Sequence, residues 1–294
     1  MKISKKINKS EWDIIVSPQS SIFHLNLKEV WAYRDLIILL VKRDLTTLYK
    51  QTILGPLWMF IQPIFTTLIY TFTFGQAKLS TDGIPPILFY LIGQTFWGYF
   101  SECLTKTSTT FISNASVFGK VYFPRLVVPV SIVISNLIKL GIQLSLLLII
   151  YLYYSTTAHA LSPQWKLFIL LPLFIAMIGV FSLSLGILFS SVTTKYRDFN
   201  FLITFAIQLV MFISCVVLPA SMFNGKTQFL MLCNPVAGCM EAIKHILTGS
   251  GVFSSTFILI NTIVTLFLLA VSVILFNRTE KSFMDTVWVR WLSK

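Results

Sequence analysis

The chain has 294 residues, of which 55% are hydrophobic, 15% aromatic and only 12% charged, and its formal net charge is +12. A soluble domain carries about 25% charged residues, so this composition excludes an ordinary soluble domain and indicates a membrane protein. Most of the 23 lysines and arginines fall in alternate gaps between long apolar runs. That distribution is typical of a chain that crosses a membrane many times with both termini in the cytoplasm. Topology thus explains the positive charge, which does not indicate nucleic acid as a partner.

The chain divides into three expected regions. Residues 1–53 are predicted to form a cytoplasmic N-terminal segment, residues 54–276 a transmembrane domain and residues 277–294 a cytoplasmic tail. In the first region, residues 27–50 carry apolar side chains at helical spacing that basic residues interrupt, which predicts an amphipathic helix in the cytoplasmic membrane interface. Its charges leave too few uncharged residues between them to cross about 30 Å of hydrocarbon, which disfavours a membrane span.

Apolar runs of the length of a membrane span follow. The predicted spans are residues 54–74, 87–105, 126–154, 166–190, 200–218 and 256–276. Each has close to the roughly 20 apolar residues that a transmembrane helix needs, and the third is long enough to tilt. The expected fold class is therefore an all-α integral membrane protein with six transmembrane helices.

The segment between the last two spans, residues 219–255, is too apolar for an ordinary external loop and too interrupted to cross the membrane. Asn234 is placed to cap a helix whose first residue is Pro235, and Gly249 is placed to end it. Such a helix of about 14 residues would be roughly 21 Å long, about half a membrane thickness. We expect a re-entrant pair of short external helices, which is tolerated where protein or water covers the backbone. A helix lying on the outer surface is the alternative.

No catalytic or nucleotide-binding motif is present in the sequence. Residues 225–227 (GKT) resemble the end of a phosphate-binding loop, but Ala220 stands where its first glycine is required. The chain is therefore expected to have no ATP site, no metal site and no enzymatic activity of its own. The four cysteines have no CxxC spacing, and a disulfide between Cys233 and Cys239 is the less favoured alternative to free thiols.

Polar and aromatic residues recur at steps of four along three spans, and residues four apart lie on one helix face. These faces comprise Trp58, Gln62, Thr66 and Tyr70 in the first span, Ser131, Ser135, Asn136, Lys139 and Gln143 in the third, and Arg197, Phe201, Phe205 and Gln208 in the fifth. Such a face either joins helices by hydrogen bonds or lines a polar passage. Because aromatic rings stack on the C–H faces of sugars and amides bond their hydroxyls, the first and fifth spans are the candidates to line a passage for a sugar chain.

Lys139 is the charge deepest inside a span. A charge at that depth costs at least about 2.5 kcal/mol and is usually functional or paired. Glu102 is a possible partner, but residue counts place the two at depths roughly 12 Å apart, which argues against direct contact. The alternatives are that Lys139 reaches toward the outer surface or faces a wet cavity.

Basic residues near predicted span ends on the inner side are candidates to hold an anionic head group. They are Arg43, Lys50, Arg125 and Arg197. The alternative is that they only anchor the topology and bind bulk anionic lipid.

Several sequence blocks stand out together. They are RDLTTLYKQTILGPLWMFIQP (43–63), NASVFGKVYFPR (114–125), TKYRDF (194–199), NPVAGCMEAIKHILTG (234–249) and NRTEKSFMDTV (277–287). In this order they resemble the membrane subunit of polysaccharide-exporting ABC transporters, the ABC-2 type permeases of O-antigen and capsule export. The resemblance extends over nearly the whole chain after about residue 25, and the residues before that point match no motif.

The resemblance implies partners and roles. Two copies of the chain would form a channel, and two separate ATPase subunits, which bind ATP and Mg, would dock on its cytoplasmic side. The ATPase would contact a coupling helix with the candidate residues Asn114, Ser116, Val117, Phe118, Lys120 and Tyr122. Residues 27–50 would be the family's interface helix. Residues 219–255 would be its pair of external gate helices, including Asn234, Pro235 and Glu241.

The implied function is export of a polysaccharide linked to undecaprenyl diphosphate across the bacterial inner membrane. An ABC-2 exporter of another cargo, such as teichoic acid, a drug or a lipid, is the first alternative. A secondary transporter is less favoured, because the sequence shows neither an inverted repeat nor buried carboxylates. A membrane glycosyltransferase or phosphatase would need clustered acidic residues, which the sequence also lacks.

Overall fold

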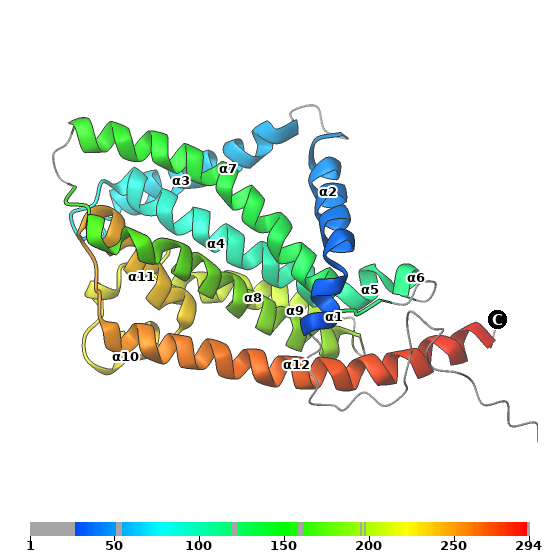
Figure 1. Ribbon diagram of the computed structural model, residues 1–294. Coiled ribbons are helices and arrows are strands. Elements are labelled where there is room, and N and C mark those ends of the chain that lie inside the picture. The colour runs from blue at the N-terminus through cyan, green and yellow to red at the C-terminus, as the bar shows by residue number, and fades with distance from the viewer. Residues whose placement is uncertain are drawn as a thin grey trace, which may run out of the picture.

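The computed structural model describes residues 27–50, 55–118, 123–157, 161–194, 196 and 198–292, and within these ranges it describes no side chain for residues 27, 28, 48, 49, 56, 115, 116 and 277–292. Every regular element in the described ranges is a helix. In chain order they are α1 (Leu27–Ala32), α2 (Arg34–Lys50), η2 (Gly55–Leu57), α3 (Trp58–Gln76), α4 (Pro86–Ser108), α5 (Thr110–Ser113), α6 (Ala115–Phe118), α7 (Val127–Thr157), η3 (Trp165–Leu170), α8 (Leu171–Thr193), α9 (Phe199–Ile213), η4 (Ala220–Met222), α10 (Lys226–Leu232), α11 (Pro235–Thr248) and α12 (Ser255–Leu292) (Figure 1).

α4 lies at the centre of the bundle. It packs against α7 and α8 and also contacts α3, α9 and α11. Most of its side chains are buried, including Phe89, Tyr90 and Phe96. In Figure 1, α4, α7, α8 and α12 run beside one another, α10 and α11 gather at one end of the bundle, and α5 and α6 lie toward the other end. We refer to these as the α10–α11 end and the α5–α6 end.

α2 lies across the bundle near its α5–α6 end (Figure 1). It packs against α7, and its residues Ile37, Leu40 and Val41 are buried, whereas Ile38 and Leu39 on its other side are exposed. A helix that lies in a membrane interface would run crosswise to the spans in this way. The helix is interrupted at Tyr33, which separates α1 from α2.

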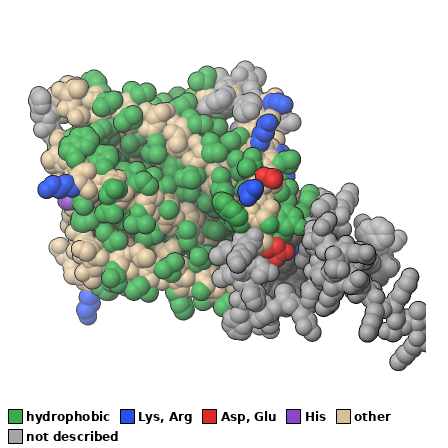
Figure 2. Space-filling model, in the orientation of Figure 1, with side chains coloured by type: hydrophobic (Ala, Val, Ile, Leu, Met, Phe, Trp, Pro, Cys, Tyr) green, Lys and Arg blue, Asp and Glu red, His purple; other side chains and the backbone are tan. Residues whose placement is uncertain are grey.

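Several helices have the length and composition of membrane spans. Among the described residues, Val127–Thr157, Trp165–Thr193 and Ser255–Phe276 are long and apolar enough to cross a membrane, and Phe199–Ile213 is apolar but shorter. Figure 2 shows apolar side chains over the middle of the visible face, with charged side chains toward its two ends. An apolar band between charged ends is the surface of a multi-pass membrane protein.

Two predicted boundaries differ from the structure. α9 ends at Ile213, before the predicted end of its span, and Cys215 then adopts a left-handed backbone with φ of 56°. The apolar run continues through Val216 and Val217, but both are buried in protein. Hydropathy alone does not separate such a buried turn from a membrane-facing helix. At the other end of the chain, α12 runs without a break past the predicted start of the tail to Leu292.

The capped helix predicted between the last two spans is confirmed as α11. Oδ1 of Asn234 accepts a hydrogen bond from the backbone N–H of Val236 at 3.1 Å, and Pro235 is the first helical residue. Gly249 ends the helix with φ of 77°, a conformation that glycine adopts without strain. All the cysteines are free thiols, namely Cys103, Cys215, Cys233 and Cys239, so the alternative disulfide is not formed.

Candidate functional site

The faces of α3 and α9 that were predicted to line a passage are open in the single chain. The residues on them that are exposed or half-buried are Trp58, Gln62, Thr66, Tyr70, Phe201, Phe205 and Gln208. Phe201 is 79% exposed. Arg197, predicted on the same face of the fifth span, lies outside the described residues.

Tyr70 connects α3 to its neighbours near the α10–α11 end. Its ring packs edge-on against Phe74 at 5.6 Å and Tyr90 at 6.0 Å between centroids. Its hydroxyl donates to the sulfur of Met211 on α9 at 3.6 Å. α3 and α9 therefore meet at this end, and their open faces belong to neighbouring helices.

Part of the polar face of the third span is buried inside the bundle. The hydroxyls of Ser131 and Ser135 are buried and donate to backbone carbonyls of their own helix, α7. The side-chain amide of Gln143 donates to the backbone carbonyl of Met59 at 3.4 Å and so joins α7 to α3. Of these three residues, Gln143 joins two helices as the packing alternative expects, whereas the two serines bond within α7.

α4 carries an open polar stripe that sequence reasoning missed. Between residues 94 and 109 all of its apolar side chains are buried, and the residues left exposed or half-buried are polar or glycine. They are Gln94, Gly98, Ser101, Glu102, Thr105, Lys106 and Thr109. Steps of three and four residues place them on one helix face. The spacing is visible in the sequence, but the bulky aromatic residues between them give the run the appearance of an ordinary span.

A charge cluster joins this stripe to α7. The Nζ of Lys139 forms an ion pair with Oε1 of Glu102, and the Nζ of Lys106 lies 3.4 Å from Oε2 of the same carboxylate. Lys106 also donates to Oδ1 of Asn136 on α7 at 3.3 Å. One carboxylate therefore holds two ammonium groups that come from two helices.

The prediction that Glu102 and Lys139 do not touch is thus wrong. It took the inner ends of the two spans as level. The contacts pair Lys106 with Asn136 and Glu102 with Lys139, so the last residue of α4, Ser108, lies opposite a point well inside α7. The first turns of α7 therefore extend beyond the end of α4, and this offset brings the two charges to the same depth.

The predicted coupling segment is divided between α5 and α6. The backbone carbonyl of Asn114 accepts from the N–H groups of Val117 and Phe118, both at 3.0 Å, which starts the short helix α6. Val117 is exposed, whereas Phe118 is buried. The side chain of Ser116 and the whole of Lys120 and Tyr122 lie outside the described residues.

An aromatic cluster attaches α6 to the bundle. The ring of Phe118 lies 5.9 Å from that of Phe111 and 5.6 Å from that of Phe123. Phe111 in turn stacks on Phe276 of α12 at 4.9 Å. The guanidinium carbon of Arg125 lies 5.6 Å from the centre of the Phe118 ring, within cation–π range. α6 is therefore packed on α5 through Phe111, and Phe111 connects both short helices to α12.

The basic residues predicted to hold a head group differ in how open they are. Arg43 is half-exposed and pairs with its neighbour Asp44 at 2.8 Å, and Lys50 is exposed at the end of α2. Arg125 is only 5% exposed and lies among the rings of the aromatic cluster. In this conformation Arg125 is enclosed by protein, and Arg197 lies outside the described residues.

The α10–α11 end contains a fully buried ion pair. The carboxylate of Glu241 and the Nζ of Lys244 are 3.2 Å apart, and their side chains are 0% and 1% exposed. Lys244 also donates to the carbonyl of Cys215 at 2.5 Å and lies 3.8 Å from the centre of the Phe89 ring. Glu241 accepts from the backbone N–H of Val252 at 3.3 Å. Lys244 lies in the segment that the sequence predicts to be external, and within that segment its buried side chain joins α11 to α4 and to the turn after α9.

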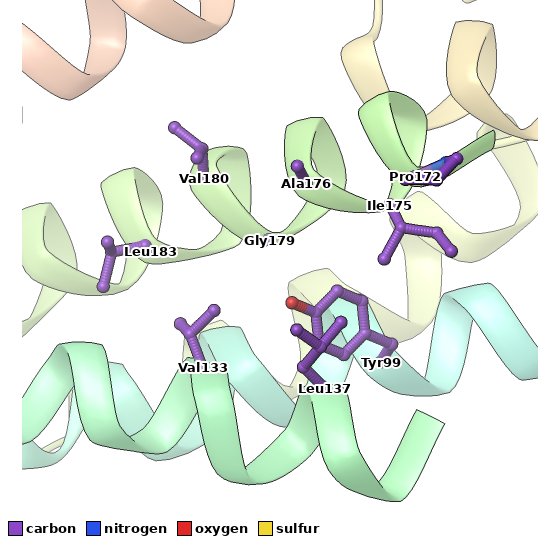
Figure 3. Close-up of a pocket in the computed structure, with 9 residues that line it drawn as sticks. All are labelled: Tyr99, Val133, Leu137, Pro172, Ile175, Ala176, Gly179, Val180 and Leu183. Atoms are coloured by element: carbon purple, nitrogen blue, oxygen red, sulfur yellow. The ribbon is translucent and has the colours of Figure 1, made fainter. Parts of the chain in front are cut away.

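A groove of about 380 Å³ lies between α4, α7 and α8 (Figure 3). Its lining comprises Tyr99, Val133, Leu137, Pro172, Ile175, Ala176, Gly179, Val180 and Leu183. The tyrosine hydroxyl is the one polar side-chain group among them. Such a surface suits hydrocarbon, and it offers too few hydrogen-bonding groups for a sugar chain or a phosphate.

Comparison with known proteins identifies the family. The model of the ABC-2 type transporter family matches residues 35–248, which is most of the chain. The chain belongs to the ABC-2 type transporter family. The match runs from the start of α2 to the end of α11, so it contains the open faces of α3, α4 and α9, the coupling segment and the charge cluster.

Similar curated proteins also cover most of this ABC-2 type chain. It is 26% identical over 223 residues to the O-antigen export system permease protein RfbA of Myxococcus xanthus, covering 75% of this chain and 83% of the relative. It is 25% identical over 255 residues to a protein of the same name from Klebsiella pneumoniae, covering 85% of this chain and 94% of the relative. Family membership makes the chain a membrane component of a transporter, a class of subunit that is not itself catalytic.

Proposed function

We propose that the chain is the permease subunit of an ATP-driven exporter that moves a lipid-diphosphate-linked polysaccharide of the O-antigen or capsule type across the bacterial inner membrane. The observation that carries this is that the relatives are O-antigen export system permeases, each of which the chain matches over most of both sequences. An ABC-2 exporter of another cargo, such as teichoic acid, a drug or a lipid, is the second candidate.

In the proposed topology α3, α4, α7, α8, α9 and α12 are the six spans, both termini are cytoplasmic, and the α5–α6 end faces the cytoplasm. The excess of basic residues in the corresponding gaps supports this orientation. α10 and α11 form the re-entrant external pair. In support, nearly every residue of α11 is buried in protein, which is the condition under which a short helix is tolerated at membrane depth.

Two copies of the chain form the proposed channel, with the open faces of α3 and α9 lining it. Aromatic and amide side chains such as Phe201, Phe205 and Gln208 offer many weak contacts to sugar rings and hydroxyls, which suits a chain that must slide. Arg43, Lys50 and Arg197 attract the anionic head group at the cytoplasmic surface, where membrane lipid also competes for them.

Two separate ATPase subunits supply the energy and bind ATP and Mg. They dock on α6, where the exposed Val117 supports a contact role, and the aromatic cluster behind Phe118 supports transfer of the motion to the bundle. The chain itself contributes no nucleotide site.

The test is surface polysaccharide in a deletion strain of the source organism, complemented with the wild type, with Val117→Asp or with Val117→Thr. We expect deletion to abolish surface polysaccharide and to leave it accumulated inside the cell. Val117→Asp places an unpaired charge in the ATPase contact and is expected to lower export about tenfold or more, the factor that 1.4 kcal/mol of lost docking gives. Val117→Thr keeps the shape and is expected to export normally.

All three proteins are also quantified in the membrane fraction, so that loss of export is separated from loss of the protein. Unchanged surface polysaccharide after deletion, in a strain without a second exporter, would reject the proposed cargo in favour of the second candidate.

A further inference from the structure

The open stripe of α4 is unusual for a helix in hydrocarbon. A lipid-facing helix exposes apolar side chains, whereas between residues 94 and 109 all apolar side chains of α4 are buried and those left half-buried or exposed are polar or glycine. The stripe therefore faces water, substrate or another protein surface. α7 lies along one side of it through the contacts of Lys106 and Glu102, and α9 and α3 also pack on α4.

The charge cluster extends from the last turn of α4 into the bundle. Glu102 is six residues before the end of α4, so it lies about 9 Å from that end along the helix axis. Lys139 is twelve residues after the start of α7, about 18 Å along that longer helix. Ionisable groups at such depth are rare and mark paths of ions or substrates more often than they serve as surface anchors.

The cluster differs from a structural ion pair of the same protein. Glu241 and Lys244 are one acid and one base, almost completely buried, and their charges cancel. In the cluster, one carboxylate faces two lysines, so a positive charge is left over. The side chain of Lys106 is 49% exposed, that of Glu102 32% and that of Lys139 15%. An excess ammonium charge that stays open within a polar stripe is suited to an incoming anion.

We propose that Lys106 and Lys139 bind the phosphate groups of the lipid-linked substrate inside the bundle, and that Glu102 holds both ammonium groups in place until the substrate arrives. The site rests on the proposed function, because it takes a substrate that carries a phosphate ester in the membrane. Lysine binds phosphate as a flexible point charge, and both lysines reach the position of one carboxylate. The hydroxyls of Ser101 and Thr105 lie on the same face and offer further hydrogen bonds.

Each lysine can be removed without breaking the whole cluster. Lys106→Gln leaves the pair of Glu102 and Lys139, and Lys139→Gln leaves the pair of Glu102 and Lys106. A cluster that only joins α4 to α7 would tolerate the loss of half-exposed Lys106. Glu102→Gln distinguishes an anion-binding role of the cluster from a purely structural one. If the lysines bind the anion, removal of the competing carboxylate should strengthen anion binding. If the cluster only joins α4 to α7, the same substitution should destabilise the fold and weaken binding.

The experiment measures binding of radiolabelled undecaprenyl diphosphate to the purified full-length chain in nanodiscs of neutral phosphatidylcholine. We expect Lys106→Gln and Lys139→Gln each to raise the Kd about tenfold, the loss of one charge-assisted contact. Lys106→Arg keeps the positive charge and should keep the Kd near the wild-type value, whereas Glu102→Gln should lower the Kd several-fold. Lys166→Gln removes an exposed lysine outside the cluster and should leave the Kd unchanged.

Three outcomes would overturn the site. These are wild-type binding in both lysine variants, weaker binding in a folded Glu102→Gln variant, and no binding by the wild type. A gel-filtration profile confirms that each variant is folded. Phosphatidylglycerol added at the same concentration distinguishes the sources of phosphate, and equal displacement by it would show a bulk-lipid site and reject the substrate assignment.

The deletion strain keeps this test apart from that of the proposed function. If deletion abolishes surface polysaccharide but Lys106→Gln binds undecaprenyl diphosphate as the wild type does, the site is rejected and the proposed function stands. Unchanged surface polysaccharide on deletion, in a strain without a second exporter, would reject the proposed function.

Discussion

At the α10–α11 end, Glu241 and Lys244 form an ion pair that is buried away from water. The sequence predicts Glu241 as a gate residue and places Lys244, three residues later, in the same external segment. The two lie on one helix face at i and i+3, so the pairing was available from the spacing alone. What the sequence did not reveal is that Cys215 and Phe89 close around Lys244, because those contacts join segments far apart in the chain.

We predict that Lys244→Met destabilises the protein more than the double substitution Glu241→Leu with Lys244→Met. Removing one partner leaves a buried, uncompensated carboxylate, which typically costs about 3–5 kcal/mol, whereas replacing both by apolar groups is often close to neutral. The apparent Tm of the purified proteins in detergent measures the difference. Equal losses of Tm in the single and double variants would show that the contacts of Lys244 with Cys215 and Phe89 matter more than its charge.

Among the helices, the sequence predicts those ends that capping residues determine. It does not predict the ends that depend on packing against segments far apart in the chain. Asn234, Pro235 and Gly249 fix α11 through a cap, a first-turn proline and a left-handed glycine, so the sequence gives both ends. α9 stops early because the chain turns at Cys215 against the rest of the protein, and nothing local signals this. The same limit concealed the stripe of α4, since its openness depends on which neighbours cover the other faces.

Close packing between α4 and the turn after α9 can be tested by a substitution at Gly93. A Cβ on Gly93 would lie 2.9 Å from the backbone carbonyl oxygen of Val216, and backbone cannot move aside as a side chain does. Gly93→Ala is therefore expected to destabilise the protein by about 1–3 kcal/mol, although alanine favours a helix over glycine by up to about 1 kcal/mol.

Gly141→Ala on α7 is the matched control, because no atom lies within 4 Å of its Cβ position. It should be neutral or stabilising. Thermal unfolding in detergent compares the two, and a Gly93→Ala protein as stable as the Gly141→Ala protein would contradict the close approach of α4 to this turn.

Across the whole molecule, one cluster of apolar residues joins the segments at the α5–α6 end. It includes Ile37, Leu40 and Val41 of α2, Phe111 of α5, Phe118 of α6, Val127 of α7, Ile187 of α8 and Phe276 of α12. The crosswise helix, the coupling segment and three long helices therefore share one packed core. Because packed cores are rearranged rather than compressed, a push on α6 is expected to move these elements together.

This arrangement predicts that Phe118 matters for the efficiency of export more than for ATP hydrolysis. Phe118→Leu keeps an apolar side chain but loses the ring contacts with Phe111 and Phe123, each of which contributes about 0.5–1.5 kcal/mol. In the assembled permease–ATPase complex we expect ATP hydrolysis to stay near the wild-type rate, while polysaccharide exported per ATP falls several-fold. The neighbouring Ile112→Leu, at a partly exposed position, should leave this ratio unchanged.

A Phe118→Leu complex with a wild-type ratio would mean that the motion of α6 reaches the bundle by another route. If export and hydrolysis fell in equal proportion, the role of Phe118 would be in docking the ATPase rather than in transmitting its motion.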